Sequence, residues 1–83
     1  MRIYMQTPAM DNKPPRFYHL HIQEDLLEGW TLITETGYQG VSGRVKKIHF
    51  SQRNNAVDTL IRMRDIQSNK GYRTVFSEGV ILE

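Results

Sequence analysis

The chain contains no cysteine among its 83 residues. This absence excludes disulfide bridges, thiolate zinc sites and a cysteine nucleophile, and it fits a reducing compartment, so we expect a cytoplasmic protein. No apolar run approaches the ~20 residues that a membrane-spanning helix requires. The first residues also lack an apolar segment of ~7–15 residues, so we expect neither a signal peptide nor a membrane partner.

The net charge is small, at +2, but its distribution along the chain is uneven. Between Arg44 and Arg73, eight basic residues stand against two acidic ones, which leaves a local charge of +6. Residues 1–43 carry three basic and five acidic groups. A basic half of this kind is typical of an anion-binding surface, although a solvated helix and strand with ordinary surface cations would have the same composition.

The length and composition predict one small folded domain. Hydrophobic residues make up 39% of the chain and charged residues 24%. A domain of this size buries a limited share of its surface, so it must place nearly all its apolar side chains in one core. Residues 2–6 could add an edge strand, and residues 7–15 hold all three prolines, which cannot donate to a sheet ladder. We therefore expect an N-terminal strand and Pro-containing linker over residues 1–15 and the main domain over residues 16–83.

Two segments after the prolines predict a β-hairpin. Apolar and polar residues alternate over residues 16–23 and again over residues 30–36, which is typical of half-buried strands. Residues 24–29 between them are polar around two leucines and end in glycine, which indicates a turn. The two strands should therefore pair antiparallel. Trp30 alternates with Leu32 and is expected in or near the core.

The clearest predicted element is a helix over residues 52–69. Its apolar residues follow the i, i+3, i+4 spacing of an amphipathic helix. We expect Ser51 to cap its start and Gly71, with positive φ, to cap its end. Residues 44–50 before it are strand-like, with an imperfect alternation that suggests a bulge. The predicted apolar face of the helix comprises Ala56, Val57, Leu60, Ile61, Met63 and Ile66.

The C-terminal part predicts a strand over residues 72–76, a tight turn over residues 77–79 and a short last strand over residues 80–82. Strands thus precede and follow a single helix. This order predicts an α+β fold: an antiparallel β-sheet with one long α-helix packed across one face.

Three glycines punctuate the segment between the second and third long strands. Gly37, Gly40 and Gly43 recur at every third position, which favours an irregular turn that needs positive φ or close backbone approach. The spacing differs from the G-x-G-x-x-G dinucleotide loop, and it follows a hairpin strand rather than opening a βαβ unit.

The sequence from Thr36 to Arg44, with this glycine spacing, resembles the WGR family. That family is named for a Trp-Gly-Arg tripeptide followed by an aliphatic residue, a glycine, two variable residues and another glycine. The aromatic-rich strands before the segment, Phe50-Ser51 at the start of the helix and Lys70-Gly71-Tyr72 at its end also fit. The similarity covers roughly residues 16–76 and is greatest to short stand-alone bacterial proteins of this kind.

The resemblance implies a WGR-like fold and a non-catalytic module that binds DNA or another nucleic acid. The same domain occurs in poly(ADP-ribose) polymerases, where the family tryptophan packs against the sugar at a DNA end and the arginine takes part in DNA and interdomain contacts. Here Thr36 and Tyr38 occupy those two positions. Threonine has no π-face and tyrosine no positive charge. The alternative is therefore a protein-interaction or accessory regulatory module that has lost DNA-end binding.

The predicted nucleic-acid site combines the glycine segment with nearby cations. Tyr38 could stack on a base or sugar, or could pack to hold the loop. The basic cluster after the glycines could contact phosphates, or could protect a sheet edge. Arg62 and Arg64 are weaker candidates, because residues two apart on a helix point in different directions. The predicted nucleic-acid-binding residues are Tyr38, Gln39, Arg44, Lys46, Lys47 and Arg73.

No pattern in the sequence predicts catalysis, a metal or a cofactor. His19 and His21 share one face of a strand and His49 could approach them, but zinc usually needs a fourth ligand and no cysteine is present. Asp25 lies in an acidic surface turn, which lacks the burial that tunes a catalytic carboxyl group. No serine has an adjacent base in sequence. We therefore expect no catalytic residues, no metal site, no cofactor and no enzyme.

Overall fold

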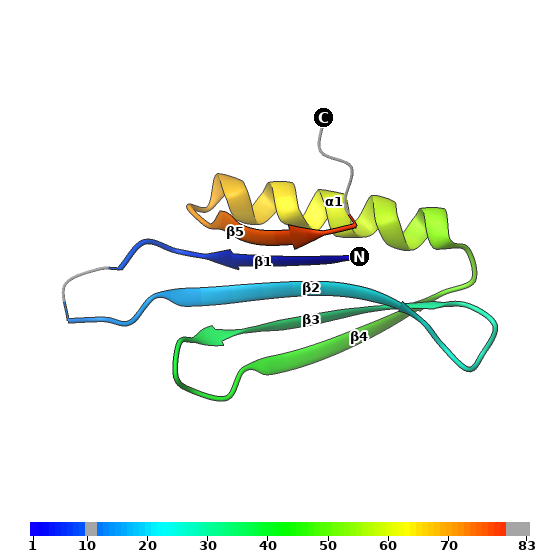
Figure 1. Cartoon of the computed structure of the whole chain (residues 1–83), viewed down its shortest axis with the longest axis horizontal. Helices are drawn as coiled ribbons and strands as arrows, with labels where there is room; N and C mark the ends of the chain where they lie inside the picture. Colours follow the sequence, from blue (N-terminus) through cyan, green and yellow to red (C-terminus); the bar gives the residue numbers. More distant parts are fainter. Residues whose placement is uncertain (10–11, 80–83) are drawn as a thin grey trace.

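The computed structural model of the chain describes residues 1–9 and 12–79. They form a five-stranded antiparallel sheet and one helix, which confirms the α+β fold expected from the sequence. No helix among these described residues has the length and apolar character to cross a membrane. Figure 1 shows the elements in order: β1 (Arg2–Gln6), β2 (Arg16–Glu24), β3 (Trp30–Tyr38), β4 (Arg44–Phe50), α1 (Arg53–Asn69) and β5 (Arg73–Glu78).

Strand β1 lies inside the sheet, whose order is β4-β3-β2-β1-β5. The expectation of an edge strand over residues 2–6 is therefore wrong. Strand β1 pairs antiparallel with β2 on one side and with β5 on the other. Its Ile3 and Met5 side chains are fully buried, so the sheet needs this strand to complete its core. Strands β4 and β5 occupy the two edges.

The predicted hairpin is present and is longer than expected. Strands β2 and β3 pair without interruption from Arg16 opposite Tyr38 to Glu24 opposite Trp30. Strand β3 thus continues through Gly37 and Tyr38, beyond the predicted end at residue 36. Trp30 is partly buried and packs against the core, as predicted.

The helix carries the chain from one edge of the sheet to the other. A 17-residue helix rises by about 25 Å, close to the about 23 Å length of the seven-residue strand β4. The chain therefore returns to the level at which β5 can begin beside β1 (Figure 1).

Two predictions at the sheet edges need correction. Strand β4 pairs with β3 without a register shift, so the bulge expected there is absent. The irregularity lies between β1 and β5 instead, where Val75 is the extra residue. Ser77 and Glu78, predicted as a turn, continue β5 because they pair with β1. The strand predicted over residues 80–82 lies outside the described residues.

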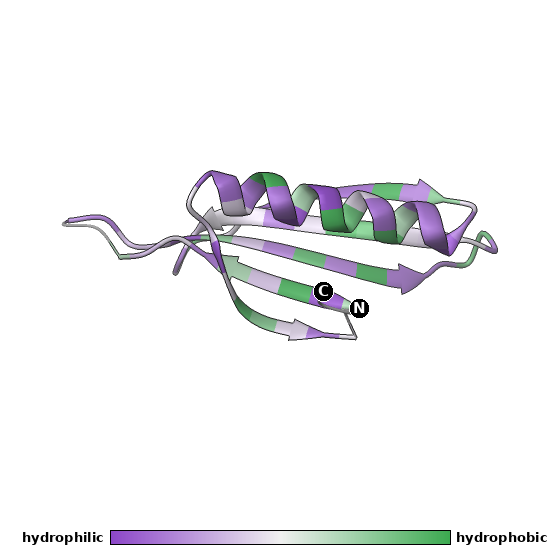
Figure 2. Ribbon diagram, turned by 90° about the horizontal axis from the view of Figure 1, so that it is seen from above, coloured by the Kyte–Doolittle hydropathy of each residue, from purple (hydrophilic) through white to green (hydrophobic). Residues whose placement is uncertain are grey.

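The two faces of the sheet have different environments. Figure 2, which looks onto the helix, shows α1 along β2 to β4, with β1 and β5 to one side. The face toward the helix, the covered face, contains the core, and the opposite face, the open face, carries no helix of the described chain. Eight buried residues form the core: Ile3, Met5, Leu20, Ile22, Leu32, Ala56, Leu60 and Tyr72.

The helix begins later than the sequence suggests. Gln52 occupies the N-cap position with extended backbone angles and makes no side-chain capping hydrogen bond, so the prediction of Ser51 as the cap is wrong. The main-chain carbonyl of Gln52 accepts the first helical hydrogen bonds, from the N–H groups of Asn55 and Ala56. Ser51 stands one residue too early for the N-cap position.

The buried stripe of the helix is narrower than the predicted apolar face. Ala56 and Leu60 are fully buried, and Val57, Ile61 and Met63 are partly buried. Ile66 is 45% exposed, which corrects its assignment to the core. Six residues beyond Leu60, Ile66 is turned by about 120° around the helix axis and so points away from the sheet.

The glycine segment shows both properties expected from the sequence, a positive φ and a close backbone approach. Gly40 has a φ of +84°, within the left-handed region that favours glycine. Gly43 meets the need for close approach: a Cβ atom there would lie 2.6 Å from the Glu35 side chain and 2.9 Å from the Phe17 ring. The absence of a side chain at Gly43 therefore lets the 39–43 turn lie against the open face of the sheet.

Leu60→Ala should lower the free energy of unfolding by about 2–5 kcal/mol, because it leaves a cavity between the helix and the sheet. Urea denaturation followed by circular dichroism measures this change. The matched control is Ile66→Ala on the exposed side of the same helix, which should cost much less. Equal losses for the two variants would contradict the observed orientation of the helix.

Gly71 ends the helix with a φ of +102°, as predicted. Its N–H donates to the Ser68 carbonyl and the Tyr72 N–H to that of Gln67. No atom lies within 4 Å of a Cβ added at Gly71, so only backbone strain opposes a side chain there. Gly71→Ala should therefore destabilise the fold by about 1 kcal/mol. Lys70→Ala is the control, and a Gly71→Ala melting curve identical to it would disprove the strain argument.

Candidate nucleic-acid interface

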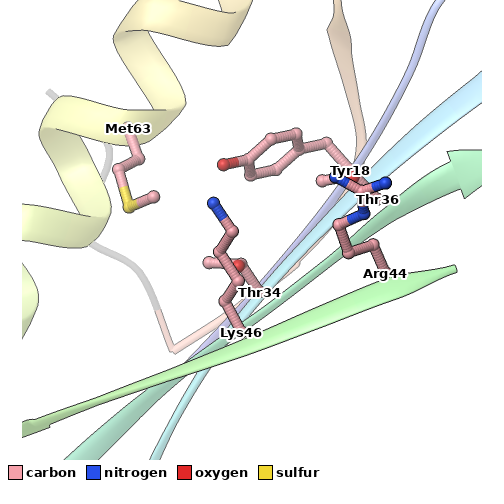
Figure 3. Close-up of a pocket in the computed structure, with 6 residues that line it drawn as sticks. All are labelled: Tyr18, Thr34, Thr36, Arg44, Lys46 and Met63. Carbon is pink, nitrogen blue, oxygen red and sulfur yellow. The ribbon is translucent and has the colours of Figure 1, made fainter.

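A hollow of about 230 Å³ lies on the covered face, between the helix and strands β2 to β4. Figure 3 shows Met63 reaching in from the helix, while Lys46 extends from β4 toward the Tyr18 ring. Arg44, the first residue of β4, lines the same hollow. The residues that line this hollow are Tyr18, Thr34, Thr36, Arg44, Lys46 and Met63.

A second hollow of about 400 Å³ lies beside the first and shares Thr36 and Arg44 with it. The two adjoining hollows are together called the helix-side groove. The second hollow extends it past the end of β3 to the glycine segment. Its lining residues are Arg16, Thr36, Gly37, Tyr38, Val41, Ser42 and Arg44.

Strand alternation and register bring these side chains together. Arg44 lies opposite Thr36 and Lys46 opposite Thr34, so both cations stand on the covered face. Thr36 in turn lies opposite Tyr18. Successive residues of a strand point to opposite faces, so Lys47 is directed to the open face. Lys46 and Lys47, although adjacent in the sequence, therefore lie on opposite faces of the sheet.

The helix-side groove is cationic and rich in hydrogen-bond donors. Arg16, Arg44 and Lys46 line it, and no carboxylate does so among the described residues. In that part of the chain none of these three cations forms an ion pair. Burial, and to a lesser degree the nearby Tyr72, raises the pKa of Tyr18, so its hydroxyl stays protonated and can donate. Such a donor set suits an anion with several oxygen atoms.

Tyr38 stands at the rim of the groove. The residue is 43% exposed, and the guanidinium carbon of Arg16 lies 5.5 Å from the centroid of its ring. This cation–π contact holds the ring in place and leaves part of it accessible. Tyr38 thus both packs locally and remains available, so the two alternatives from the sequence are not exclusive.

The other predicted site residues lie elsewhere. Gln39 turns toward β1, where its side-chain amide donates to the Tyr4 hydroxyl on the open face. Arg73 lies on β5, at the opposite edge of the sheet from β4, and therefore does not join Arg44 and Lys46. Of the six predicted residues, the structure brings together Tyr38, Arg44 and Lys46.

Arg16, Tyr18 and Met63 were missed from the sequence. Arg16 and Tyr18 belong to β2, twenty or more residues before Tyr38 and Arg44. Extending the predicted hairpin register would have placed Tyr18 opposite Thr36, because that pairing follows from the turn at residues 24–29. No pattern in the sequence signals Met63, since its position depends on how the helix crosses the sheet.

The helix arginines contribute little to the groove. Arg64 forms an ion pair with Asp65, with 3.0 Å between Nη2 and Oδ1. The guanidinium of Arg62 donates to the Thr59 hydroxyl over 3.3 Å. Both arginines therefore bind residues of their own helix. The sequence had already made them weaker candidates for binding nucleic acid.

The acidic turn after β2 has a structural role. Asp25 accepts hydrogen bonds from the N–H groups of Leu27 and Gly29 and from the Thr31 hydroxyl. Its Oδ2 also lies 2.6 Å from His49 Nδ1, which ties the turn to β4. Desolvation alone would raise the pKa of Asp25, but these hydrogen bonds together lower it. The carboxylate therefore stays charged and acts as an anchor for the turn.

His19 and His21 share the open face, as expected. Their rings lie 6.1 Å apart and nearly parallel. Within residues 1–9 and 12–79, no three metal-ligating side chains gather into a potential metal site. Partial burial, followed by the positive charge of Arg2, lowers the pKa of both imidazoles.

No family model matches this chain, and no curated protein or solved structure matches it either. The similarity to the WGR family therefore stays a prediction that depends on the glycine spacing and the flanking residues.

The pKa of His19 and His21 should lie below the ordinary 6.5 of histidine. Acid should then favour the unfolded state, which binds protons more readily, so these groups lower the unfolding free energy as pH falls below about 6.5. NMR titration of the imidazole Cε1 protons measures both values. Arg2→Gln should raise both pKa values, because it removes the nearby positive charge. Values at or above 6.5, or values unaffected by Arg2→Gln, would contradict this electrostatic account.

Proposed function

We propose that this chain is a non-catalytic module that binds nucleic acid, with DNA as the expected partner, through the helix-side groove. The observation that carries the proposal is the convergence of Arg16, Arg44 and Lys46 on this groove with no carboxylate in its described lining. Binding to phosphate groups requires such point charges, and contacts between cations and phosphates supply most of the affinity in non-specific binding.

The groove favours contact with the backbone of a nucleic acid over readout of its bases. Its cations and hydroxyl groups suit phosphate oxygens, which position a nucleic acid but carry no sequence information directly. Tyr38, held beneath Arg16, offers a ring edge and face at the rim for a sugar or base. We therefore expect weak, sequence-tolerant binding, with a dissociation constant of about 10⁻⁴–10⁻⁶ M near physiological salt.

The resemblance to the WGR family supports DNA as the partner, and a bacterial cytoplasm as the setting. Thr36 and Tyr38, at the family's Trp and Arg positions, both line the groove. We therefore expect this chain to contact the nucleic-acid backbone in general, and not the DNA end that the polymerases contact. In this proposal Arg16 supplies the positive charge beside the ring of Tyr38.

One observation favours a second candidate, a protein-interaction module. Leu26 is fully exposed and Leu27 is 75% exposed at the tip of the β2–β3 turn. Asp25 holds this turn rigidly through its backbone hydrogen bonds, so the two leucines are presented as a fixed apolar tip. Exposed apolar side chains held in this way are typical of protein contacts. A Leu26→Ser and Leu27→Ser variant that loses a biological activity but keeps nucleic-acid binding would favour this function.

Replacing Arg44 and Lys46 together by alanine should weaken binding to all duplex sequences alike. The slope of log affinity against log salt should fall by about one unit for each phosphate that the variant no longer neutralises. Fluorescence anisotropy with a labelled DNA duplex at two or more salt concentrations measures both quantities. Both side chains are exposed, so the fold should tolerate the change.

Lys47→Ala is the matched control for this experiment. Compared with the single variant Lys46→Ala, it removes the same charge from the same strand, but on the opposite face of the sheet. Duplex affinity should fall slightly or not at all. Equal losses for Lys47→Ala and Lys46→Ala would show that general charge, rather than the helix-side groove, determines binding.

A further inference from the structure

The open face of the sheet carries an unusual set of side chains. In an antiparallel sheet with one covered face, the other face is usually polar. Here Tyr4 on β1 lies opposite His19 on β2 and opposite Phe76 on β5. These three aromatic rings thus stand on three adjacent strands, in one row across the sheet. His21 extends the row along β2.

Three of the rings are in contact, and Phe76 lies beside Tyr4 by strand register. The Tyr4 and His19 centroids lie 6.0 Å apart with their planes tilted by 60°, and the His19 and His21 rings lie 6.1 Å apart with only 15° between their planes. Phe17 stacks at 6.1 Å from Tyr4 and is itself buried, so it supports the surface from one side. Gln39 fixes the Tyr4 hydroxyl by a hydrogen bond. The surface is therefore preorganised rather than a chance collection of mobile side chains.

The core does not need all of these rings. Phe76 is 48% exposed and is not part of the buried cluster. Tyr4, His19 and His21 are half-buried, and no helix among residues 1–9 and 12–79 lies over them. An exposed phenylalanine beside such rings leaves apolar surface in water, which a ligand with flat aromatic groups would cover.

Two arginines flank the rings and can contact an anionic ligand. Arg2 and Arg73 lie on the open face, on either side of the row that contains Tyr4 and Phe76. Glu35 lies opposite His19 and its charge acts on that imidazole, while its side chain also packs against Gly43. Glu78 faces Arg2 in the register, whereas Arg73 lies opposite the uncharged Gln6. The imidazoles are neutral near pH 7 because burial and then Arg2 lower their pKa, so their faces are available for stacking.

We propose that the open face binds single-stranded nucleic acid, with bases stacked on Phe76, Tyr4 and His19 and phosphates contacted by Arg2 and Arg73. Bases are accessible for stacking only when they are unpaired, and aromatic platforms with flanking cations bind single strands with little sequence preference. Duplexes offer no free base faces and are not bound here. This surface is separate from the helix-side groove and does not depend on the function proposed for that groove.

The decisive variant is Phe76→Leu, which keeps an apolar side chain and removes the ring. Loss of one stacking ring should weaken binding of a labelled 12-nucleotide oligothymidine by about tenfold. Binding of a 12-base-pair duplex should be unchanged. Val75→Ala, an exposed apolar neighbour on the same strand, is the matched control and should leave both affinities unaltered. Circular dichroism melting verifies that both variants remain folded.

NMR titration of the wild-type protein with the same oligothymidine locates the contact. Upfield shifts of the Phe76, Tyr4 and His19 ring protons are expected, since each would lie beneath a base. The variant with alanine at positions 44 and 46 should show the same shifts, and their presence in that variant separates this surface from the groove.

Four results would overturn the proposal: no oligothymidine binding at low salt, equal affinities for wild type and Phe76→Leu, shifts confined to the helix-side groove, or a dimer without nucleic acid that Phe76→Leu dissociates. The last result, measured by sedimentation, would assign the open face to self-association. If the groove does not bind duplex DNA, these four results can still be interpreted, because the single-strand assay measures binding at a different face of the sheet.

Discussion

A single 17-residue helix must stabilise a five-stranded sheet, and the rest of the structure depends on this constraint. Ala56 and Leu60 bury the helix against β2 and β3, where Leu20 and Leu32 meet it. One helix covers only one face of a sheet, and only part of it, since helix side chains span about 10 Å while five strands span about 19 Å. The helix-side groove is therefore a part of the covered face that the helix borders without filling it, and the open face carries no helix of the described chain.

The two proposed binding surfaces have different chemistry because strand side chains alternate. On β4, Arg44 and Lys46 face the groove beside the helix, and Lys47 faces the other way. On β1, Ile3 and Met5 enter the core, and Arg2 and Tyr4 face outward. A one-residue slip of either strand would exchange the core for the surface, so burial of the apolar residues also fixes which cations and rings each surface presents.

The glycine segment connects these surfaces. Gly37 and Gly43 approach each other closely, and this lets the turn press on Phe17 and Glu35 at the open face. The same turn contributes Val41 and Ser42 to the helix-side groove on the other face. Glycine at these positions therefore reflects close packing between the turn and the sheet, and one short segment shapes the border of both proposed binding surfaces.

Local patterns in the sequence determined the α+β class, the β2–β3 hairpin, the helix and the positive φ of Gly71, because each depends on periodicity or on a single residue's allowed backbone angles. Pairings between distant segments were decided by the tertiary structure. Strand β1 became an interior strand because β5 pairs beside it at the edge opposite β4, and this position of β5 excludes Arg73 from the groove. Arg16 and Tyr18 joined Arg44 only through the register of three strands. Such contacts arise from the burial of one shared core, which a short window of sequence does not contain.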